Sequence, residues 1–138
     1  MVLKVRVLTS TRVICTTTAD EVILPGLTGQ VGVLEGHATL VTALDTGLLR
    51  IKLDGKWTPI ILCGGLAEID RNQVTVLANE VEEIIDVNLN TATSKLEEAT
   101  IEAEKMMSDS TKTSKERLQA SDELKKAMAR CRAINYLS

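Results

Sequence analysis

Residues 20–52, DEVILPGLTGQVGVLEGHATLVTALDTGLLRIK, decide the fold of this chain. The stretch contains five of the eight glycines, one of the two prolines and the only histidine. Apolar residues alternate with turn-forming residues throughout it. Because glycine tolerates positive φ and lets backbones approach closely, the pattern predicts short strands joined by tight turns. No catalytic or metal-binding constellation is built into the stretch, which favours a surface for docking.

The β pattern continues on both sides of this stretch. Apolar residues alternate with basic ones in Leu3–Val7, which is typical of a half-buried strand. Further strands are predicted over residues 21–24, 30–34, 48–53, 57–62, 66–69 and 74–77. Asp54-Gly55 and Arg71-Asn72 mark the tips of two hairpins. Many short strands with closely spaced turns imply an antiparallel β-sandwich.

Gly64-Gly65 lies between the predicted strands over residues 57–62 and 66–69. Neither G-x-G-x-x-G nor a Walker lysine follows the pair, so a phosphate-binding loop is not indicated. Close strand packing or a β-bulge explains the two glycines better.

The second half of the chain has a helical pattern. From Thr91 onward there is no glycine or proline, and small apolar residues recur at helical spacing on two stripes. The first stripe contains Ala92, Leu96, Ala99, Ala103 and Met106, and the second contains Ala120, Leu124, Ala127, Cys131 and Ile134. Residues 108–114 are polar, and Thr113 to Glu116 has capping-box spacing, so the second helix is predicted to begin there. The predicted domains are therefore a β-sandwich over residues 1–86 and an antiparallel αα-hairpin over residues 87–138.

Composition excludes several classes of protein. A formal net charge of −3, with no Phe, one Trp and one Tyr, provides neither a basic footprint nor a stacking platform for nucleic acid. No apolar run approaches the roughly 20 residues that cross a bilayer. The beginning, MVLKVRVLTS, has a strand pattern and not that of a signal or transit peptide. Three scattered cysteines, Cys15, Cys63 and Cys131, argue for a reducing compartment and for packing roles.

Few residues qualify as catalytic candidates. His37 has no nucleophile and orienting carboxylate at suitable spacing, so it is interpreted either as a turn residue that hydrogen-bonds backbone or as a binding residue. Glu82, Glu83 and Asp86 could pair as acid and base, but their place at the domain junction favours a solvated linker.

The motifs around the opening stretch resemble one family. They are P-x-x-x-G-Q-x-G-V-L-x-x-H-A from Pro25, T-A-L-D-x-G-L-L-R-I from Thr42, GGLAEI at 64–69, NQVTVLAN at 72–79 and ELKKAMARCRAI at 123–134. Together they resemble the ε subunit of F-type ATP synthases over nearly the whole chain. The run GLLRIKLDGKW most resembles the plastid and cyanobacterial branch. Where the family usually has His-Ala-Pro, this chain has His37-Ala38-Thr39.

The resemblance implies that the chain catalyses no reaction itself. It implies a non-catalytic subunit with no metal or cofactor, which couples the γ shaft to the membrane c-ring. Gln30, Val31 and Gly32 would form a loop that faces the c-ring, and His37 and Thr42 would lie near the γ contact. The subunit would be peripheral to an energy-coupling membrane, on the stromal side of a thylakoid or the cytoplasmic side of a bacterial membrane.

The resemblance also implies that the hairpin restrains ATP hydrolysis. In its extended placement the hairpin would reach the catalytic α and β subunits. Four basic residues of the second helix fall largely on the side opposite its apolar stripe, where they would meet an acidic partner: Lys125, Lys126, Arg130 and Arg132. A merely solvated face is the alternative interpretation of this basic cluster.

Three other functions stay open at this point. One is an ATP-sensing module, because some bacterial members bind ATP through I/L-D-x-x-R-A. Here Asn88 replaces the acid and Thr91 replaces the arginine, whose bidentate phosphate contact threonine cannot make. The others are an adaptor of another complex and a small hydrolase. The sequence predicts weak ATP binding or none.

Overall fold

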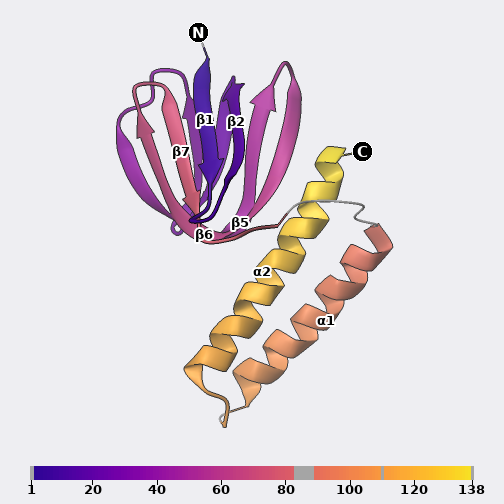
Figure 1. Cartoon of the computed structure of the whole chain (residues 1–138). Coiled ribbons are helices and arrows are strands. Elements are labelled where there is room, and N and C mark those ends of the chain that lie inside the picture. Colours follow the sequence, from indigo (N-terminus) through magenta and orange to yellow (C-terminus); the bar gives the residue numbers. More distant parts are fainter. Residues whose placement is uncertain (1, 83–88, 110, 138) are drawn as a thin grey trace. The chain divides into compact units, whose positions relative to one another are not determined.

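The structure of this chain, a computed structural model, describes residues 2–82, 89–109 and 111–137. The chain divides into two compact units, Met1–Glu83 and Ile84–Ser138. The first contains every strand and the second both helices (Figure 1). The predicted boundary between residues 86 and 87 lies outside the described residues, as do Glu83 and Asp86.

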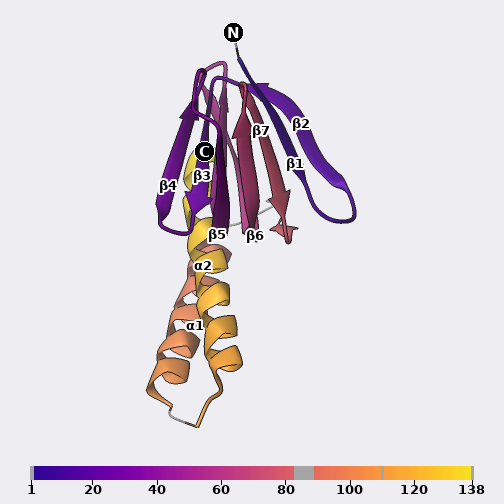
Figure 2. The same cartoon turned by 90° about the vertical axis from the view of Figure 1, so that its left-hand side faces the viewer.

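The first unit is a β-sandwich, as predicted. Its strands are β1 (Leu3–Leu8), β2 (Val13–Ala19), β3 (Glu21–Gly26), β4 (Gly29–Leu34), β5 (Leu40–Leu53), β6 (Lys56–Asp70), β7 (Gln73–Ala78) and β8 (Val81–Glu82). They pair in the order β2-β1-β7-β6-β5-β3-β4, and β8 pairs with β6. Figures 1 and 2 show these strands enclosing a common interior.

The sandwich is not wholly antiparallel. β1 runs parallel to β7, with Lys4 opposite Gln73 and Leu8 opposite Leu77. All the other pairs among the described strands are antiparallel. A parallel pair needs a long connection instead of a tight turn, and the chain from β2 through β6 supplies it. The prediction of a purely antiparallel sandwich is therefore wrong in this one pair.

The strands are also longer and more numerous than predicted. β5 has 14 residues and β6 has 15, although the sequence predicted shorter pieces. β2, with the sequence VICTTTA, was missed because its threonines give no clear apolar alternation. The two long strands connect the two layers of the sandwich. One part of β6, residues 65–70, pairs with β7, and a different part of the β5–β6 ribbon, around residues 50–52 of β5, pairs with β3.

The two predicted hairpin tips are confirmed. Asp54 and Gly55 between β5 and β6 have φ of 52° and 78°, and Arg71 and Asn72 between β6 and β7 have φ of 48° and 62°. Positive φ at both central residues is the geometry of a type I′ turn, whose twist matches that of the flanking strands.

Gly65 is required by close strand packing and not by a bulge. The register of β6 with β5 is the same on both sides of the glycine pair, from Leu40–Ile69 to Leu53–Lys56, so no residue is inserted there. Gly65 has φ 141°, and a Cβ there would clash with the carbonyl oxygen of Leu77 and lie 2.9 Å from Cα of Ala78. Of the two predicted explanations, close packing is the right one.

The sandwich core follows from alternation along the strands. In β1, Leu3, Val5 and Val7 are at most 1% exposed, while the intervening Lys4 and Arg6 are exposed. The remaining core side chains are almost all Val, Leu, Ile and Ala from β2 to β7. The core is therefore aliphatic, as composition predicts.

The second unit is a pair of antiparallel helices, α1 (Leu89–Ser108) and α2 (Ser114–Leu137), side by side in both views (Figures 1 and 2). Four alanines of the predicted stripes are buried, with Ala92 and Ala127 each only 1% exposed, and the other described stripe residues are partly buried. The predicted start of α2 is confirmed, because the backbone N–H of Glu116 donates to Oγ1 of Thr113 at 3.2 Å. The side chain of Ile134 lies outside the described residues.

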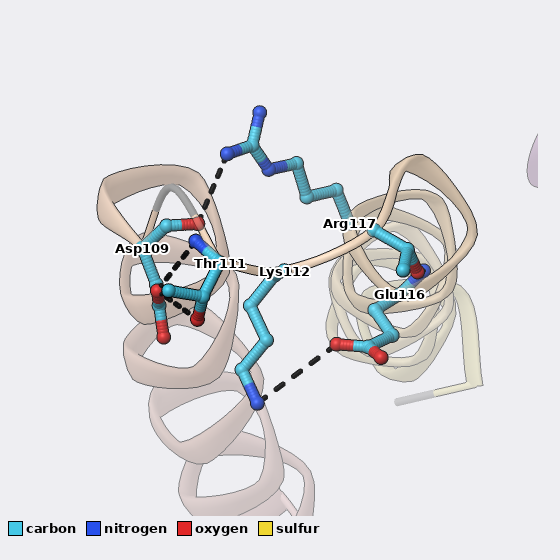
Figure 3. Close-up of polar contacts among 6 residues, drawn as sticks. Asp109, Thr111, Lys112, Glu116 and Arg117 are labelled. Carbon is cyan, nitrogen blue, oxygen red and sulfur yellow. Dashed lines mark hydrogen bonds and ion pairs between the residues drawn. The ribbon is translucent and has the colours of Figure 1, made fainter.

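A polar turn joins α1 to α2 (Figure 3). The carboxylate of Asp109 accepts hydrogen bonds from Oγ1 of Thr111 at 2.6 Å and from its backbone N–H at 2.9 Å. Arg117 donates from its guanidinium to the carbonyl oxygen of Asp109 at 3.0 Å, and Nζ of Lys112 lies 3.8 Å from Oε2 of Glu116. The turn is thus held by side chains of the turn itself and of the first turn of α2.

The hydrogen bonds from Thr111 change the pKa of the Asp109 carboxyl. The side-chain bond first, and then the backbone bond, lower the pKa of Asp109 below its ordinary value. We expect Thr111→Val to raise that pKa towards the ordinary value, whereas Thr111→Ser should preserve it. Titration of the Asp109 carboxyl carbon by NMR measures both variants. An unchanged pKa in Thr111→Val would show that the hydroxyl is not the cause.

The lowered pKa of Asp109 makes the stability of the turn depend on pH. The folded-state pKa of Asp109 is depressed, so its stabilising contribution is fully present above the unfolded-state pKa. That contribution is lost as pH falls through the lower folded-state pKa. The turn should therefore loosen only in acid, and Thr111→Val should loosen at higher pH than the parent.

Candidate functional site

The predicted c-ring residues begin strand β4 and are not a loop. Gln30 and Gly32 are exposed, while Val31 packs partly against the sandwich core. Gly32 does not have positive φ, and a Cβ built on it meets nothing within 4 Å. The fold itself therefore does not require glycine at this position.

The two predicted γ-contact residues differ in their surroundings. Nδ1 of His37 donates to the carbonyl oxygen of Ala38 at 2.7 Å, and the backbone N–H of His37 donates to the carbonyl oxygen of Leu34 at 3.1 Å. His37 is thus the turn residue of the first interpretation. Thr42 lies in β5 opposite the core residue Ala67, so its half-buried side chain is on the core side.

An exposed apolar cluster lies on the outer face of the sandwich. Ala43, Leu66 and Leu77 are directly opposite one another across β5, β6 and β7, and Val41 is two residues along β5 on the same face. Val41 is 60% exposed, and Leu66 and Leu77 are each 45% exposed. We call these four residues the outer apolar cluster. Contiguous exposed apolar side chains are typical of interaction sites.

Sequence reasoning missed this cluster, although the signal for it was present. In the predicted strand over residues 66–69, Leu66 has the same parity as Glu68, which is exposed, and not that of the buried Ala67. Period-two alternation therefore places an apolar residue on the solvent side.

The basic residues of α2 are less uniform than predicted. Arg132 is exposed, whereas Lys125, Lys126 and Arg130 are partly buried. Nζ of Lys126 lies 3.5 Å from Oε1 of Glu123. Arg130 lines the groove between α1 and α2, so the prediction that it points away from the partner helix is wrong. At about 100° per residue, position 130 lies at the border of the apolar stripe and not opposite it.

The side of α2 opposite its stripe is not wholly solvated either. Ala129 and Ala133 lie there and are 3% and 0% exposed. The sequence pattern left this side either solvated or free to meet another surface, and it did not predict that these alanines are buried.

The groove between the helices bears on nucleotide binding. It has a volume of about 830 Å³ and is lined by Ala99 of the first stripe, by Ala120 and Ala127 of the second, and by charged side chains. Four of the charged residues are glutamates and three are cations: Glu98, Glu102, Glu116, Glu123, Lys95, Lys112 and Arg130. Repulsion by the glutamates disfavours a triphosphate, in keeping with the prediction of weak ATP binding. Thr91 is exposed, and Asn88 lies outside the described residues.

Cysteines and possible metal ligands are the remaining reactive side chains in the part of the chain that the structure describes. Cys15, Cys63 and Cys131 are half-buried and form no disulfide among the described residues, and burial raises the pKa of the Cys15 thiol. Among residues 2–82, 89–109 and 111–137, no group of three or more His, Cys, Asp or Glu side chains is arranged to hold a metal ion. Neither described helix is long and apolar enough to cross a membrane.

A β-sandwich with an exposed apolar cluster, followed by a helical hairpin without a catalytic constellation in its described residues, has the features of a protein–protein binding module. Residues 2–84 match the family model described as ATP synthase, Delta/Epsilon chain, beta-sandwich domain. The chain belongs to the family of ATP synthase epsilon chains, as its motifs predict. It is a non-catalytic subunit of the ATP synthase complex.

Relatives of this chain carry the same name in several organisms. The ATP synthase epsilon chain, chloroplastic, of Phaeodactylum tricornutum is 70% identical over 138 residues, which covers 100% of both chains. The protein of that name from Thalassiosira pseudonana is 71% identical over 138 residues with the same coverage. That of Pylaiella littoralis is 47% identical over 137 residues, or 99% of this chain and 100% of the relative. These names agree with the plastid and cyanobacterial branch that GLLRIKLDGKW resembles, and they fall on its plastid side.

Solved structures share the fold at low sequence identity. A chain of the Euglena gracilis mitochondrial ATP synthase, in a structure of OSCP, F1 and c-ring, matches with a TM-score of 0.76 and 19% identity. The match covers 96% of this chain and 81% of that one. A chain of the Tetrahymena thermophila central stalk and c-ring matches with a TM-score of 0.58 and 9% identity, over 95% of each chain.

Proposed function

We propose that this chain is a central-stalk subunit that couples the γ subunit to the c-ring, and that its sandwich makes both contacts. The outer apolar cluster is the observation that carries this proposal. An apolar surface of this kind gains free energy when a partner covers it, at about 25 cal/mol per Å² of apolar area. Val41 in the cluster is next to Thr42, which the family resemblance associates with γ.

The c-ring contact is assigned to the start of β4. Gln30 and Gly32 are exposed there, and nothing within the fold occupies the space that a side chain at position 32 would take. A bare backbone permits a partner to approach closely, which gives Gly32 a reason that folding does not provide. The fold neighbours come from assemblies that include a c-ring, which supports the c-ring as a partner.

A truncated chain tests where these contacts reside. We expect a chain that ends at residue 86 to assemble with γ and the c-ring and to support at least part of proton-coupled ATP synthesis. It keeps every glycine turn, the outer apolar cluster and β4. Reconstitution into complexes that lack the subunit measures assembly and synthesis. A truncated chain that retains its β signal in circular dichroism but does not bind γ would refute the assignment.

We further propose that the hairpin restrains ATP hydrolysis by reaching the catalytic α and β subunits. Its basic residues on α2 support this proposal, because opposite charge favours contact with an acidic surface. Each exposed pair contributes only about 0–1 kcal/mol. Several pairs together suffice to bias two placements that differ by a few kcal/mol. In the plastid, these contacts would place the subunit on the stromal side of the membrane.

Charge removal on α2 tests the inhibitory role. We expect Lys126→Ala, Arg130→Ala and Arg132→Ala combined to relieve inhibition of ATP hydrolysis while γ binding is retained, and we expect added salt to act in the same direction. The matched control is Lys95→Ala, Lys105→Ala and Lys115→Ala, which removes the same charge from exposed positions of the hairpin. Steady-state ATPase assays of reconstituted complexes compare the two variants. Full inhibition by the first variant at low salt would mean that this face is only solvated.

A further inference from the structure

The outer face of the sheet formed by β2, β1 and β7 carries two cationic side chains that make no polar contact within the described residues. Lys4 and Arg6 alternate with core residues of β1, so both side chains are on the outer face and exposed. Within residues 2–82, 89–109 and 111–137, neither side chain has an ion pair or a hydrogen bond. Folding therefore gives no reason for either charge.

Polar, uncharged side chains flank both cations. Residues opposite one another on neighbouring strands point to the same face of a sheet. The opposed residues are Thr18 and Gln73 for Lys4, and Thr16 and Thr75 for Arg6. All six residues line one depression of about 460 Å³ on the outer face. These six side chains supply two positive charges, three hydroxyls and one amide, and the lining of the depression has no carboxylate.

The spacing of the two cations suits a tetrahedral oxyanion. Residues i and i+2 of a strand are about 7 Å apart. An anion between them accepts charge-assisted hydrogen bonds from both side chains, while the threonine hydroxyls and the Gln73 amide donate to its remaining oxygens. We propose that this depression, the Lys4–Arg6 site, binds inorganic phosphate. The proposal rests on the sandwich alone and is independent of the function proposed above.

Carboxylates on the adjacent strand fix the side on which the anion lies. Glu68 and Asp70 of β6 are opposite Thr75 and Gln73 of β7. Oδ1 of Asp70 accepts a hydrogen bond from Oγ1 of Thr39 at 3.2 Å, on the β5 side and away from β1. Glu68 is the closer source of repulsion for an anion over β7. The phosphate therefore lies over β1 and β2, between the cations and the threonines of β2.

The lining of the depression selects phosphate over a nucleotide. It has no aromatic side chain on which a base could stack, and the one Trp of the chain, Trp57, is not part of it. A larger ester would therefore find only threonine and aliphatic surface beyond the phosphate group. ADP should bind no more tightly than phosphate itself.

Titration of the full chain with inorganic phosphate, followed by backbone amide NMR at constant ionic strength, tests this site. We expect saturable shifts confined to residues 4–6, 16–18 and 73–75. Arg6→Ala and Lys4→Ala should each weaken binding about tenfold, because a hydrogen bond to a charged group is lost. Lys56→Ala removes an exposed lysine from the β5–β6 hairpin and should change nothing. Glu68→Gln should tighten binding.

Three outcomes would overturn the proposal. Equal shifts with chloride would mean general screening, equal weakening by Lys56→Ala would mean diffuse attraction, and ADP binding tenfold tighter than phosphate at the same residues would mean a nucleotide site. Because Lys4 and Arg6 are exposed, their alanine variants should stay folded. Unchanged amide dispersion outside the site checks that condition.

Discussion

Gly65→Val should unfold the β-sandwich under conditions in which the parent is stable. The new Cβ would meet main-chain atoms of Leu77 and Ala78, which cannot move without breaking the pairing of β6 with β7. The φ of 141° adds backbone strain, because side chains rarely adopt that region. Strain of about 1–3 kcal/mol and overpacking of a similar size together remove much of the roughly 5–15 kcal/mol that stabilises a typical domain.

Gly32→Val is the matched control for this prediction. The same side chain is added to a glycine of the sandwich, but the new Cβ meets open space and φ is not positive. We expect its free energy of unfolding to stay within about 0.5 kcal/mol of the parent. Urea unfolding followed by the fluorescence of Trp57, which lies in β6, reports on the sandwich in both variants. Similar losses of stability at positions 65 and 32 would show that close packing against Leu77 and Ala78 is not the cause.

Leu66→Asp should weaken the association of the subunit with γ by about a hundredfold. Leu66 is at the centre of the outer apolar cluster, opposite Ala43 on one side and Leu77 on the other. A central interface residue contributes about 2 kcal/mol or more, and a carboxylate in its place would be desolvated without a partner. The sandwich itself should stay folded, since this side chain is 45% exposed.

The control for this prediction is an exposed leucine outside the cluster. Leu118 in α2 is 64% exposed, so Leu118→Asp introduces the same charge at an apolar surface position of the hairpin. We expect it to leave the dissociation constant for γ unchanged. Surface plasmon resonance with immobilised γ compares both variants with the parent. If Leu66→Asp bound γ as tightly as Leu118→Asp does, γ would have to dock elsewhere on this chain.

Local signals predicted much of the fold. The two hairpin tips were predictable because Asp54, Gly55 and Asn72 are residue types that tolerate positive φ, whereas the positive φ of Arg71 is imposed by the turn. The start of α2 was predictable because the bond between Thr113 and Glu116 joins residues three apart in sequence. The parallel pairing of β1 with β7 was not predictable in this way, because it depends on where the whole chain between them runs.

The candidate sites also divide into those that local sequence motifs predicted and those that depend on strand pairing. Family motifs in the sequence pointed to Gln30 and His37, but not to the outer apolar cluster, whose members come from three strands that pair side by side. Arg130 was misplaced because it was grouped with the basic residues opposite the apolar stripe, although at about 100° per residue it lies at the border of that stripe, beside the groove between the helices.

The sequence by itself determined the family, the sandwich and hairpin, their turns and the aliphatic character of the core, because each depends on residue type and short-range periodicity. Only the tertiary structure decided which exposed residues stand together. The neighbours of Leu66 and of Lys4 come from strands that pair through the main chain, and main-chain hydrogen bonds do not depend on side-chain identity. Pairing and register therefore arise from the packing of the whole sandwich, and the surfaces that bind other molecules arise with them.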